Sequence, residues 1–405
     1  CLVGSEMCIR DRRYWLLEDA RTERSSPIGE GPQGRVGESM ADPVTAQWSI
    51  PGTSISVRNR TVLAAMTNKQ SHEDGTLSDE EISWLLSRAE GGFGIVTTAA
   101  SHVHPSGKSW EGEMGVWGDH HIPRLEELAT GIRDNGALSL VQIFHGGLRA
   151  PRSLTGMQPV SASKNLENGV EEECRALSED EILELVSSFG EAAERCERAG
   201  FDGIEIHGAH GYLICQFLGS RTNRRVDRWG GDLEGRSLFL REVISEVRNR
   251  TSERFLVCVR ISPEHEVGVK LAESLELSKM MGGWGVDMIH ISCWDAFKGP
   301  RGEDDPRTIT RIFRDELGDD AAIISTGSVW DASDAQFVID EGADMVGVAR
   351  VAIAHSDWAT GLNDGGYSPE RPPFTPEHLI SQGLSQVFVD YMRRWQGFVT
   401  DGRSE

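Results

Sequence analysis

The sequence predicts an α/β fold of the (β/α)8 TIM-barrel class. Two observations predict it: short, apolar, β-rich runs recur along the chain after residue 55, and helical patterns separate them. Strands that are apolar on both faces and alternate with helices indicate a parallel sheet covered by helices. Eight such units in about 300 residues are typical of a closed barrel. The alternative, an open doubly wound sheet, is disfavoured because no Gly-x-Gly-x-x-Gly follows the first run.

The eight expected strands follow one another at similar spacing. They are the runs 61–67, 93–100, 138–144, 201–207, 255–262, 286–292, 321–327 and 343–349.

The helical patterns between these runs carry recognisable start and stop signals. The clearest stretches are 78–92, 178–200 and 331–343. The first two begin with serine followed by acidic residues, which is typical of a helix N-terminus, and Ser78 is an expected N-cap. Several of the helices end at glycine, as a C-cap would.

The composition excludes several classes of protein. The chain of 405 residues has 41 Lys and Arg against 64 Asp and Glu, a formal charge of −23, and a mean hydropathy of −0.35. A surface this acidic argues against nucleic acid and anionic membranes, so an anionic ligand needs a local basic pocket. No run approaches the ~18 apolar residues of a membrane span.

The cysteine pattern favours a reducing compartment. Seven cysteines are scattered, and none has the Cys-x-x-Cys spacing of zinc ribbons or clustered iron–sulfur sites. We expect reduced, buried thiols and a cytoplasmic protein.

Residues 1–39 are set apart from the fold. They are rich in Gly, Pro, Ser and charge without a period, which predicts disorder, and they lack the apolar region of a secretory signal. The opening "CLVGSEMCIRDR" resembles a translated sequencing adapter, and Met40 is a candidate start. We therefore expect one folded domain over 40–405.

Two imidazoles and a phenol follow the fourth predicted strand. His207 ends that strand, and His210 and Tyr212 come directly after it, where side chains would face the mouth of a barrel. The histidines could be ordinary hydrogen-bonded residues, or metal ligands together with Glu205 on the same strand face. They could also form a paired N–H clamp that stabilises charge on a carbonyl oxygen, with Tyr212 as general acid.

Other polar residues end neighbouring strands. Arg260 interrupts the apolar fifth run and needs a partner, which could be Glu205, a bound anion or an electron-rich ring. Gln142 ends the third run and could pair with the backbone or a ligand. Thr67 ends the first run and is by itself an ordinary strand-terminal threonine.

The last two runs predict a phosphate site. Gly327 and Ser328 end the seventh run and Arg350 follows the eighth, where many barrels bind phosphate. Glycine lets backbone N–H groups approach phosphate oxygens, and arginine can make a bidentate contact. A phosphate-bearing cofactor with a flat heterocycle is therefore implied.

The residues resemble a known family. The segment "HGAHGYLICQFLGSRTNRRVDRWGGDLEGRSLFLREVI" closely resembles the signature of the Old Yellow Enzyme family, the FMN-dependent ene-reductases. That signature reads His-x-Ala-His/Asn-Gly-Tyr-Leu, Gln-Phe-Leu, then Asn-x-Arg-x-Asp-x-Tyr/Trp-Gly-Gly-Ser-x-Glu-Asn-Arg. "AAMT", "VQIFHGG", "VRIS", "STGSV" and "GADMVGVAR" follow the family's order, so the resemblance covers about 55–400.

The resemblance implies FMN as cofactor, NADH or NADPH as reductant, and roles for individual residues. His207 and His210 would hold the substrate oxygen and Tyr212 would donate the proton. Gln142 would bond the pyrimidine ring, and Arg260 would stabilise the reduced flavin. Further cofactor contacts would come, at the ring, from Ala65, Met66, Thr67 and Ala100 and, at the phosphate, from Gly327, Ser328, Gly347 and Arg350.

The chain departs from the family pattern in places. Ala65 and Asn68 flank "MT" where proline and often arginine are usual, "STGSV" replaces the commoner Gly-Gly-Ile, and "GDLEGR" replaces Gly-Ser-x-Glu-Asn-Arg. Trp229 stands where tyrosine is usual. None of these changes removes a proposed catalytic group. Without the clustered cysteines of the larger members, the chain resembles the compact, single-domain form.

The resulting prediction is an NAD(P)H:flavin oxidoreductase that reduces activated C=C bonds of α,β-unsaturated carbonyl compounds. The alternatives are a flavin-dependent oxidative demethylase or dehydrogenase, a flavin-binding protein without turnover, and a metal-dependent aldolase-type barrel. The expected partner is a small molecule rather than nucleic acid or a membrane, and a homo-oligomer is compatible with the sequence.

Overall fold

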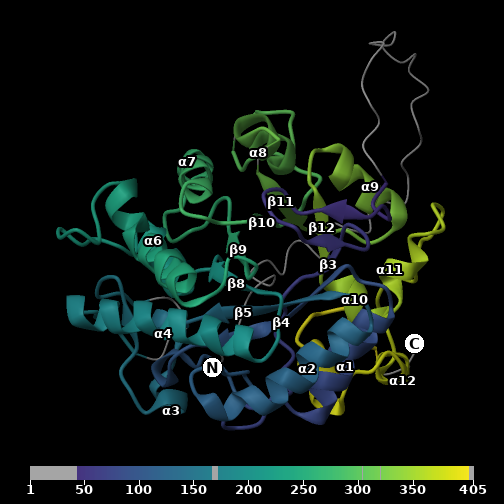
Figure 1. Cartoon of the computed structure of the whole chain (residues 1–405), viewed down its shortest axis with the longest axis horizontal. Coiled ribbons are helices and arrows are strands. Elements are labelled where there is room, and N and C mark those ends of the chain that lie inside the picture. Colours follow the sequence, from purple (N-terminus) through teal and green to yellow (C-terminus); the bar gives the residue numbers. More distant parts are fainter. Residues whose placement is uncertain (1–42, 167–171, 303, 320, 401–405) are drawn as a thin grey trace.

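The chain folds into a closed eight-stranded parallel barrel with helices around it (Figure 1). The computed structural model describes residues 43–166, 172–302, 304–319 and 321–400. The expected extension 1–39 lies outside the described residues. Around the barrel the strands pair in chain order and the ring closes between β12 and β3, with bounds β3 (Thr61–Leu63), β4 (Ile95–His102), β5 (Leu138–Phe144), β8 (Gly203–Gly208), β9 (Leu256–Ile261), β10 (Met288–Ser292), β11 (Ala322–Thr326) and β12 (Met345–Val348).

Each expected strand overlaps one observed strand, so the barrel prediction is confirmed and the open sheet is wrong; β4 and β8 extend past the expected ends at 100 and 207. The expected runs overshoot most at the first strand, where only Thr61–Leu63 belong to the ladder. Residues 64–67 are apolar enough to look like strand. Their backbone instead continues past the ladder, where the Ala65 carbonyl accepts a hydrogen bond from the Arg260 side chain.

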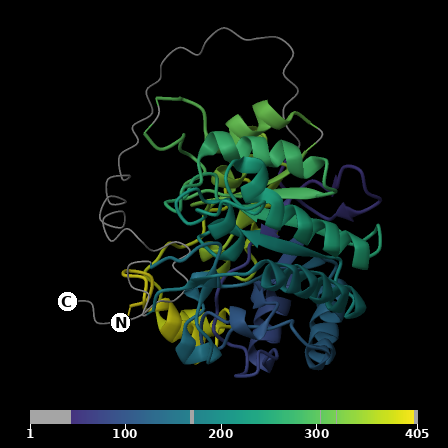
Figure 2. The ribbon, with the colours of Figure 1, turned by 90° about the vertical axis from the view of Figure 1, so that its left-hand side faces the viewer.

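Helices form the outer layer, as the view turned by 90° shows (Figure 2). Their bounds are α1 (Asp79–Glu90), α2 (Ile122–Asp134), α3 (Arg152–Thr155), α4 (Glu179–Arg198), α5 (Leu213–Leu218), α6 (Leu233–Arg250), α7 (Leu271–Gly282), α8 (Ile309–Leu317), α9 (Ala332–Asp340), α10 (Arg350–Ala354), α11 (Trp358–Gly361), α12 (Pro376–Ser381) and α13 (Gln386–Met392). The described residues also form short 3-10 helices, namely η2 (Pro105–Gly107), η3 (Asp119–His121) and η4 (Gly147–Arg149).

The predicted helix starts are confirmed. The Ser78 side chain accepts a hydrogen bond from the Glu81 backbone N–H at 3.1 Å. At the start of α4, Ser178 and Glu181 form a capping box, each side chain accepting from the other's backbone. Gly200 and Gly342 follow α4 and α9 with φ of +88° and +102°, a conformation that glycine adopts without strain.

Apolar side chains fill the amino end of the barrel. The first residues of several strands point inward and pack with Ile50 and Val57, which belong to the hairpin of β1 (Trp48–Ser49) and β2 (Ser56–Val57). This hairpin covers the apolar layer and keeps water out of it. A second small sheet, β6 (Val160–Ser161) with β7 (Arg175–Ala176), lies in the loop after β5.

Polar side chains occupy the barrel above that layer. Gln142 lies opposite Glu205 in the β5–β8 ladder, and His207 lies opposite Arg260 in the β8–β9 ladder. His290 lies opposite Arg260 in the next ladder. All five side chains are buried. The barrel is thus apolar at one end and charged and hydrogen-bonded towards the other, which is where barrel enzymes bind their ligands.

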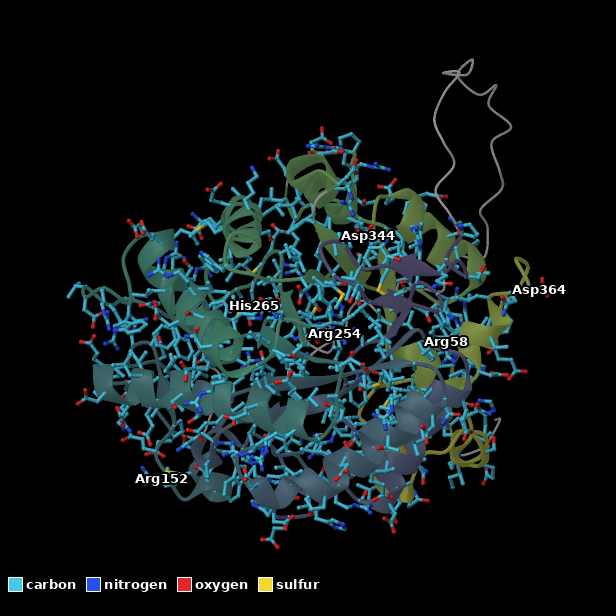
Figure 3. The ribbon with its side chains drawn as sticks, viewed as in Figure 1. Arg58, Arg152, Arg254, His265, Asp344 and Asp364 are labelled. Atoms are coloured by element: carbon cyan, nitrogen blue, oxygen red, sulfur yellow. The ribbon has the colours of Figure 1, made fainter. Side chains whose placement is uncertain are left out.

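Exposed charge lies on the outside. Arg152 and Asp364, for example, are exposed and lie at the edge of the molecule in Figure 3. In the described part of the chain, no helix is both long enough and apolar enough to cross a membrane.

Gly347 shows how tightly the polar layer is packed. A Cβ atom at this residue of β12 would lie 1.9 Å from Thr326 Oγ1 and 3.1 Å from His290 Nε2. The interior of the barrel therefore requires glycine here, because the Thr326 hydroxyl occupies the space that a side chain would take.

Gly347→Ala is expected to lower the free energy of unfolding by about 1–3 kcal/mol, since the methyl group must displace Thr326 from a packed interior. Gly282→Ala is the matched control: Gly282 is the last residue of α7 and a Cβ there meets nothing within 4 Å. The control should change stability by less than about 1 kcal/mol, and towards stabilisation. Equal urea-unfolding midpoints for the two variants would contradict this packing account.

Candidate active site

The fourth barrel strand ends in a turn that brings His207, His210 and Tyr212 together. His207 lies in β8 and is buried, and Tyr212 is the N-cap residue of α5. Between them His210 and Gly211 have φ of +60° and +74°. A positive φ is energetically unfavourable for histidine, so contacts with neighbouring residues must stabilise this turn. The structure thus places these three residues together at the carboxyl end of β8.

The two imidazoles lie in series. The Ala209 backbone N–H donates to His207 Nδ1 at 3.2 Å, so the ring proton of His207 belongs on Nε2. His207 Nε2 lies 3.3 Å from His210 Nδ1, and His210 Nε2 lies 2.7 Å from Ser292 Oγ. Each ring therefore donates to the next group along this chain. Their convergence on one ligand atom, which the expected clamp requires, stays a prediction.

Ser292 joins the histidines to the arginine of the fifth strand. Arg260 donates from Nη2 to Ser292 Oγ at 3.2 Å and from Nη1 to the Ala65 carbonyl at 3.1 Å. The sequence analysis missed Ser292, although a hydroxyl at the end of a barrel strand was a usable signal. The suggested partner of Arg260, Glu205, is influenced by its charge, which helps to lower the pKa of that carboxyl group.

The histidines at the mouth are neutral near pH 7. Burial, followed by the nearby Arg260 charge, lowers the pKa of His207 to about 3, and the same two causes place the pKa of His210 well below its ordinary value. A neutral imidazole still carries one N–H, so both rings can donate a hydrogen bond without adding positive charge.

Tyr212 lies in an aromatic pocket. Its ring centroid is 5.0 Å from those of His207 and Phe144 and 6.3 Å from that of Trp110. The Arg149 guanidinium lies 5.7 Å from the Tyr212 ring centroid, and its Nη1 donates to the His210 carbonyl at 2.7 Å. Arg149, in η4 after β5, thus supports the strained turn. The sequence analysis missed it, since nothing local distinguishes it from a surface arginine.

Gln142 is held by a buried carboxylate. Its Nε2 donates to Glu205 Oε1 at 2.6 Å, and Glu205 Oε2 lies 2.5 Å from His290 Nδ1. Burial raises the pKa of Glu205, but His290, Arg260 and Gln142 more than offset this effect and hold the pKa at about 2. Burial lowers the pKa of His290 more than its partner raises it. The pair is best described as a carboxylate bonded to a neutral imidazole.

The expected phosphate residues meet at the ends of β11 and β12. Arg350 Nη2 lies 3.5 Å from Ser328 Oγ, and that hydroxyl donates to the Trp294 carbonyl at 3.1 Å. Ser328 has φ of +57°, at a position where the family usually has glycine. A Cβ on Gly327 would lie 2.8 Å from the Cys293 carbonyl oxygen, which explains that glycine. Gly347 lies level with Thr326, inside the barrel, rather than beside Ser328.

The remaining cofactor candidates line the same end of the barrel. Ala65 offers its carbonyl to Arg260, Met66 is buried, and Thr67 is half-buried. Ala100 is buried opposite Gln142 in the β4–β5 ladder.

Asn68 explains one departure from the family pattern. It stands where arginine is often found, and it is buried, with Nδ2 donating to Glu81 Oε1 at 2.8 Å. The replacement thus has a local partner on α1.

The second half of the signature segment is structural. Asn223 donates from Nδ2 to the carbonyls of Phe217 and Trp229, both at 2.8 Å. Arg236 pairs with Glu273, with 2.6 Å between Nη2 and Oε1. Trp229 is fully buried, so the indole fills the place that the family's usual tyrosine would take. These contacts join α5 to the segment that follows it, and α6 to α7.

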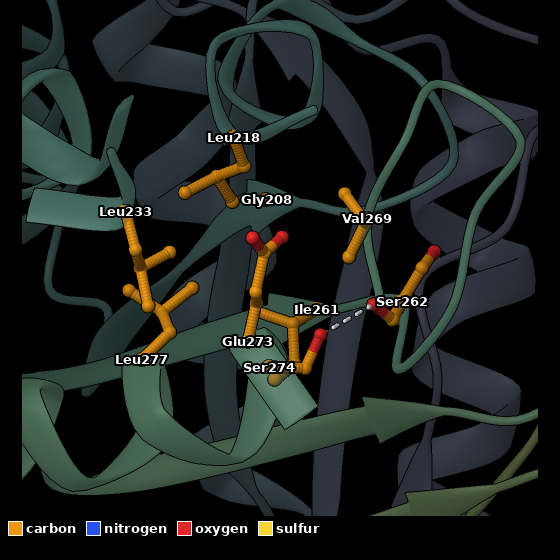
Figure 4. A pocket seen from close by; sticks show the side chains of 9 residues that line it. All are labelled: Gly208, Leu218, Leu233, Ile261, Ser262, Val269, Glu273, Ser274 and Leu277. Carbon is orange, nitrogen blue, oxygen red and sulfur yellow. Dashed lines mark hydrogen bonds between the residues drawn. The ribbon is translucent and has the colours of Figure 1, made fainter. Parts of the chain in front are cut away.

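A small cavity behind the barrel wall adjoins this region (Figure 4). Its volume is about 10 Å³, and it is lined by Gly208, Leu218, Leu233, Ile261, Ser262, Val269, Glu273, Ser274 and Leu277. Such a volume holds at most one water molecule, so it is not a ligand site.

The metal reading of Glu205 and His207 finds no support. Among the residues that the structure describes, no group of three or more His, Cys, Asp or Glu could hold a metal ion. Of the five described cysteines, which are all free, Cys293 is half-buried and the others are buried.

Comparison with known proteins identifies the family. The model of the NADH:flavin oxidoreductase / NADH oxidase family matches residues 52–368. The chain belongs to this family, the Old Yellow Enzyme family. It is an FMN-dependent oxidoreductase that uses NADH or NADPH, and the predicted family, fold and cofactors are confirmed.

Individual relatives agree with this assignment. A probable NADH-dependent flavin oxidoreductase of Bacillus subtilis, YqiG, is 37% identical over 320 residues, which are 77% of this chain and 86% of the relative. An NADH oxidase of Thermoanaerobacter brockii is 33% identical over 76% of this chain, but the match spans only 49% of that longer protein. An Old Yellow Enzyme homologue from Zymomonas mobilis shares the fold with a TM-score of 0.73 at 24% identity, over 86% of this chain and 99% of that chain.

The observed donors and acceptors fit FMN. An amide, an arginine and the backbone carbonyl of Ala65 suit a flat heterocycle with alternating donors and acceptors. A second arginine beside a left-handed Ser328 suits a phosphate.

The buried histidines predict acid sensitivity. His145, directly after β5, has its pKa lowered to about 3 by burial, and His207 behaves likewise. In the unfolded chain a histidine has a pKa of about 6.5, so between about pH 3 and 6.5 the unfolded state binds more protons. The free energy of unfolding should therefore rise with pH in this window, by about 1.4 kcal/mol per pH unit for each such histidine.

His145→Asn should reduce that slope by about 1.4 kcal/mol per pH unit, because one proton fewer is taken up on unfolding. Urea unfolding of the flavin-free protein at several values between about pH 4 and 6 measures the slopes. An unchanged slope in the variant would show that His145 is protonated in the folded protein.

Proposed function

We propose that the protein reduces activated alkenes, the α,β-unsaturated carbonyl compounds being the substrate class. The observation that carries the proposal is the grouping of His207, His210 and Tyr212 at the mouth of a flavin-binding barrel. Two neutral N–H donors suit an uncharged carbonyl oxygen that gains negative charge during reaction. A phenol nearby suits the proton that must reach the adjacent carbon.

The two histidines bind and polarise the substrate oxygen in this proposal. Their low pKa values keep them as hydrogen-bond donors without charge over the physiological range. In the structure the His207 Nε2–H donates to His210 and the His210 Nε2–H donates to Ser292, so substrate binding exchanges both of these acceptors for the substrate oxygen. Ser292 then keeps Arg260 as its other partner.

Tyr212 is the proposed proton donor. The aromatic rings of Phe144 and Trp110 shield it from water, and Arg149 lies over its ring. Shielding favours transfer of the phenolic proton to bound substrate rather than exchange with solvent.

The cofactor contacts follow from the donors at the strand ends. FMN, when bound, supplies the hydride chemistry between NAD(P)H and substrate. We propose that Gln142 and Arg260 contact its ring. Ala65, Met66, Thr67 and Ala100 would line the ring, and Gly327, Ser328 and Arg350 would hold the phosphate. Gly347 has a packing role in the structure, and its proposed phosphate contact would come through the backbone only.

The oxidative demethylase or dehydrogenase alternative is not favoured. The relatives' names are those of NADH- and NADPH-dependent reductases and oxidases, such as the YqiG oxidoreductase and the NADPH dehydrogenases. The proposed enzyme occupies a single domain over 40–405.

Tyr212→Phe should slow alkene reduction by about 10²–10⁴-fold, the usual contribution of a general acid, because the phenolic proton is lost. Reduction of the enzyme by NADPH should be unaffected, since that step needs no proton from Tyr212. Stopped-flow absorbance of the flavin under anaerobic conditions follows the two half-reactions separately, with 2-cyclohexenone as the alkene.

Tyr367→Phe is the matched control, because Tyr367 lies after α11, outside the proposed active site, and it should behave as the wild type in both half-reactions. Equal slowing of both half-reactions in Tyr212→Phe would remove Tyr212 as the acid. A wild type that is reduced by NADPH but inert towards every enone tried would refute the proposed substrate class.

A further inference from the structure

The side-chain amide of Gln142 has a defined orientation. Both Gln142 and Glu205 are buried, and Gln142 Nε2 lies 2.6 Å from Glu205 Oε1. The two ends of an amide are similar in shape, so their hydrogen-bond partners decide which end points where. A carboxylate only accepts hydrogen bonds, so it selects the NH2 end of Gln142 and turns the carbonyl oxygen away.

The ionised state of Glu205 is maintained by hydrogen-bond donors on β9 and β10, and a further donor on β11 supports the one on β10. His290 Nδ1 lies 2.5 Å from Glu205 Oε2, and Thr326 Oγ1 lies 2.6 Å from His290 Nε2. Since the ring of His290 is neutral and donates from Nδ1, its Nε2 accepts the Thr326 hydroxyl proton. The Cys258 thiol donates to the same carboxylate at 3.6 Å. Every one of these hydrogen bonds runs towards Glu205.

The remaining end of the Gln142 amide is its carbonyl oxygen. No donor from the described part of the chain reaches Oε1, although the residue is 1% exposed. A carbonyl in this position is suited to a ligand that brings its own N–H group. The pyrimidine ring of oxidised FMN carries such a group at N3.

We propose that Glu205 is a positioning residue for the cofactor: it orients the Gln142 amide so that Oε1 accepts the N3–H of the flavin. The inference rests on the proposed contact between Gln142 and the pyrimidine ring. His290 and Thr326 act one and two steps further back, since they keep Glu205 ionised and in place. Gly347 contributes to the same hydrogen-bond arrangement, because a side chain there would displace the Thr326 hydroxyl.

Glu205→Gln reverses the direction of the hydrogen bond between position 205 and Gln142, with little change in side-chain volume. The new amide keeps an oxygen for His290 Nδ1–H, so its NH2 group faces Gln142. Gln142 must then turn its oxygen towards position 205 and its NH2 towards the flavin. Two donors, Nε2–H and N3–H, would oppose each other, and a hydrogen bond would be lost.

The test is the affinity for FMN of flavin-free protein, measured by quenching of flavin fluorescence. Glu205→Gln should bind FMN at least tenfold more weakly than wild type. The double variant Gln142→Glu/Glu205→Gln should recover most of the loss, because the carboxylate now at 142 accepts from both neighbours. Glu113→Gln is the control: Glu113 is equally buried, but its partners are the backbone N–H groups of Ser109 and Trp110 and the His102 ring, and the variant should bind FMN as the wild type does.

The possible outcomes distinguish failure of this inference from failure of the proposed function. Wild-type affinity in Glu205→Gln, or no recovery in the double variant, would overturn the inference, since a merely structural Glu205 would not be rescued by exchange of the pair. A wild-type protein that binds no FMN would instead overturn the proposed function.

If Glu205→Gln does not fold, the side-chain amide resonance of Gln142 in FMN-loaded wild type decides, assigned by its loss in Gln142→Glu. One Nε2 proton shifted strongly downfield by the carboxylate supports the inference, and an unshifted pair contradicts it.

Discussion

A carboxylate held inside the barrel is the constraint around which the mouth is arranged. An isolated ionised carboxyl group would be very costly at this depth, so Glu205 must be surrounded by donors. Gln142, His290 and Cys258 supply them, from three different strands, and Arg260 supplies a compensating charge. Each of these side chains thereby loses its freedom to turn. The polar layer is rigid because one charge inside it has to be satisfied.

The rigid polar layer also orients the side chains nearer the mouth of the barrel. Arg260 is held by the Ala65 carbonyl and Ser292, and Ser292 in turn bonds His210. Arg260, a proposed flavin contact, and His210, a proposed substrate contact, are therefore connected through the Ser292 hydroxyl group. A chain of this kind places groups with little reorganisation at the moment of reaction, which is what electrostatic stabilisation of a developing charge requires.

Much of this could be predicted from the sequence, and the failures have a common cause. The eight strands were predictable because buried parallel strands are continuous apolar runs, and His207, His210 and Tyr212 because they directly follow one of them. Ser292 and Arg149 were missed because their importance comes from partners on other strands and loops. Glu205 was noticed, but as a metal ligand or a partner of Arg260. Its hydrogen-bond partners Gln142 and His290, 63 and 85 residues away, leave no local pattern.

The central claim concerns the position of the flavin, and a crystal structure of the protein with FMN measures that position most directly. We expect the isoalloxazine ring at the barrel mouth, with Gln142 between the ring and Glu205 and with Arg260 at the edge of the ring. The phosphate should lie beside Ser328 and Arg350. A ring bound elsewhere, or one that contacts neither Gln142 nor Arg260, would contradict the central claim.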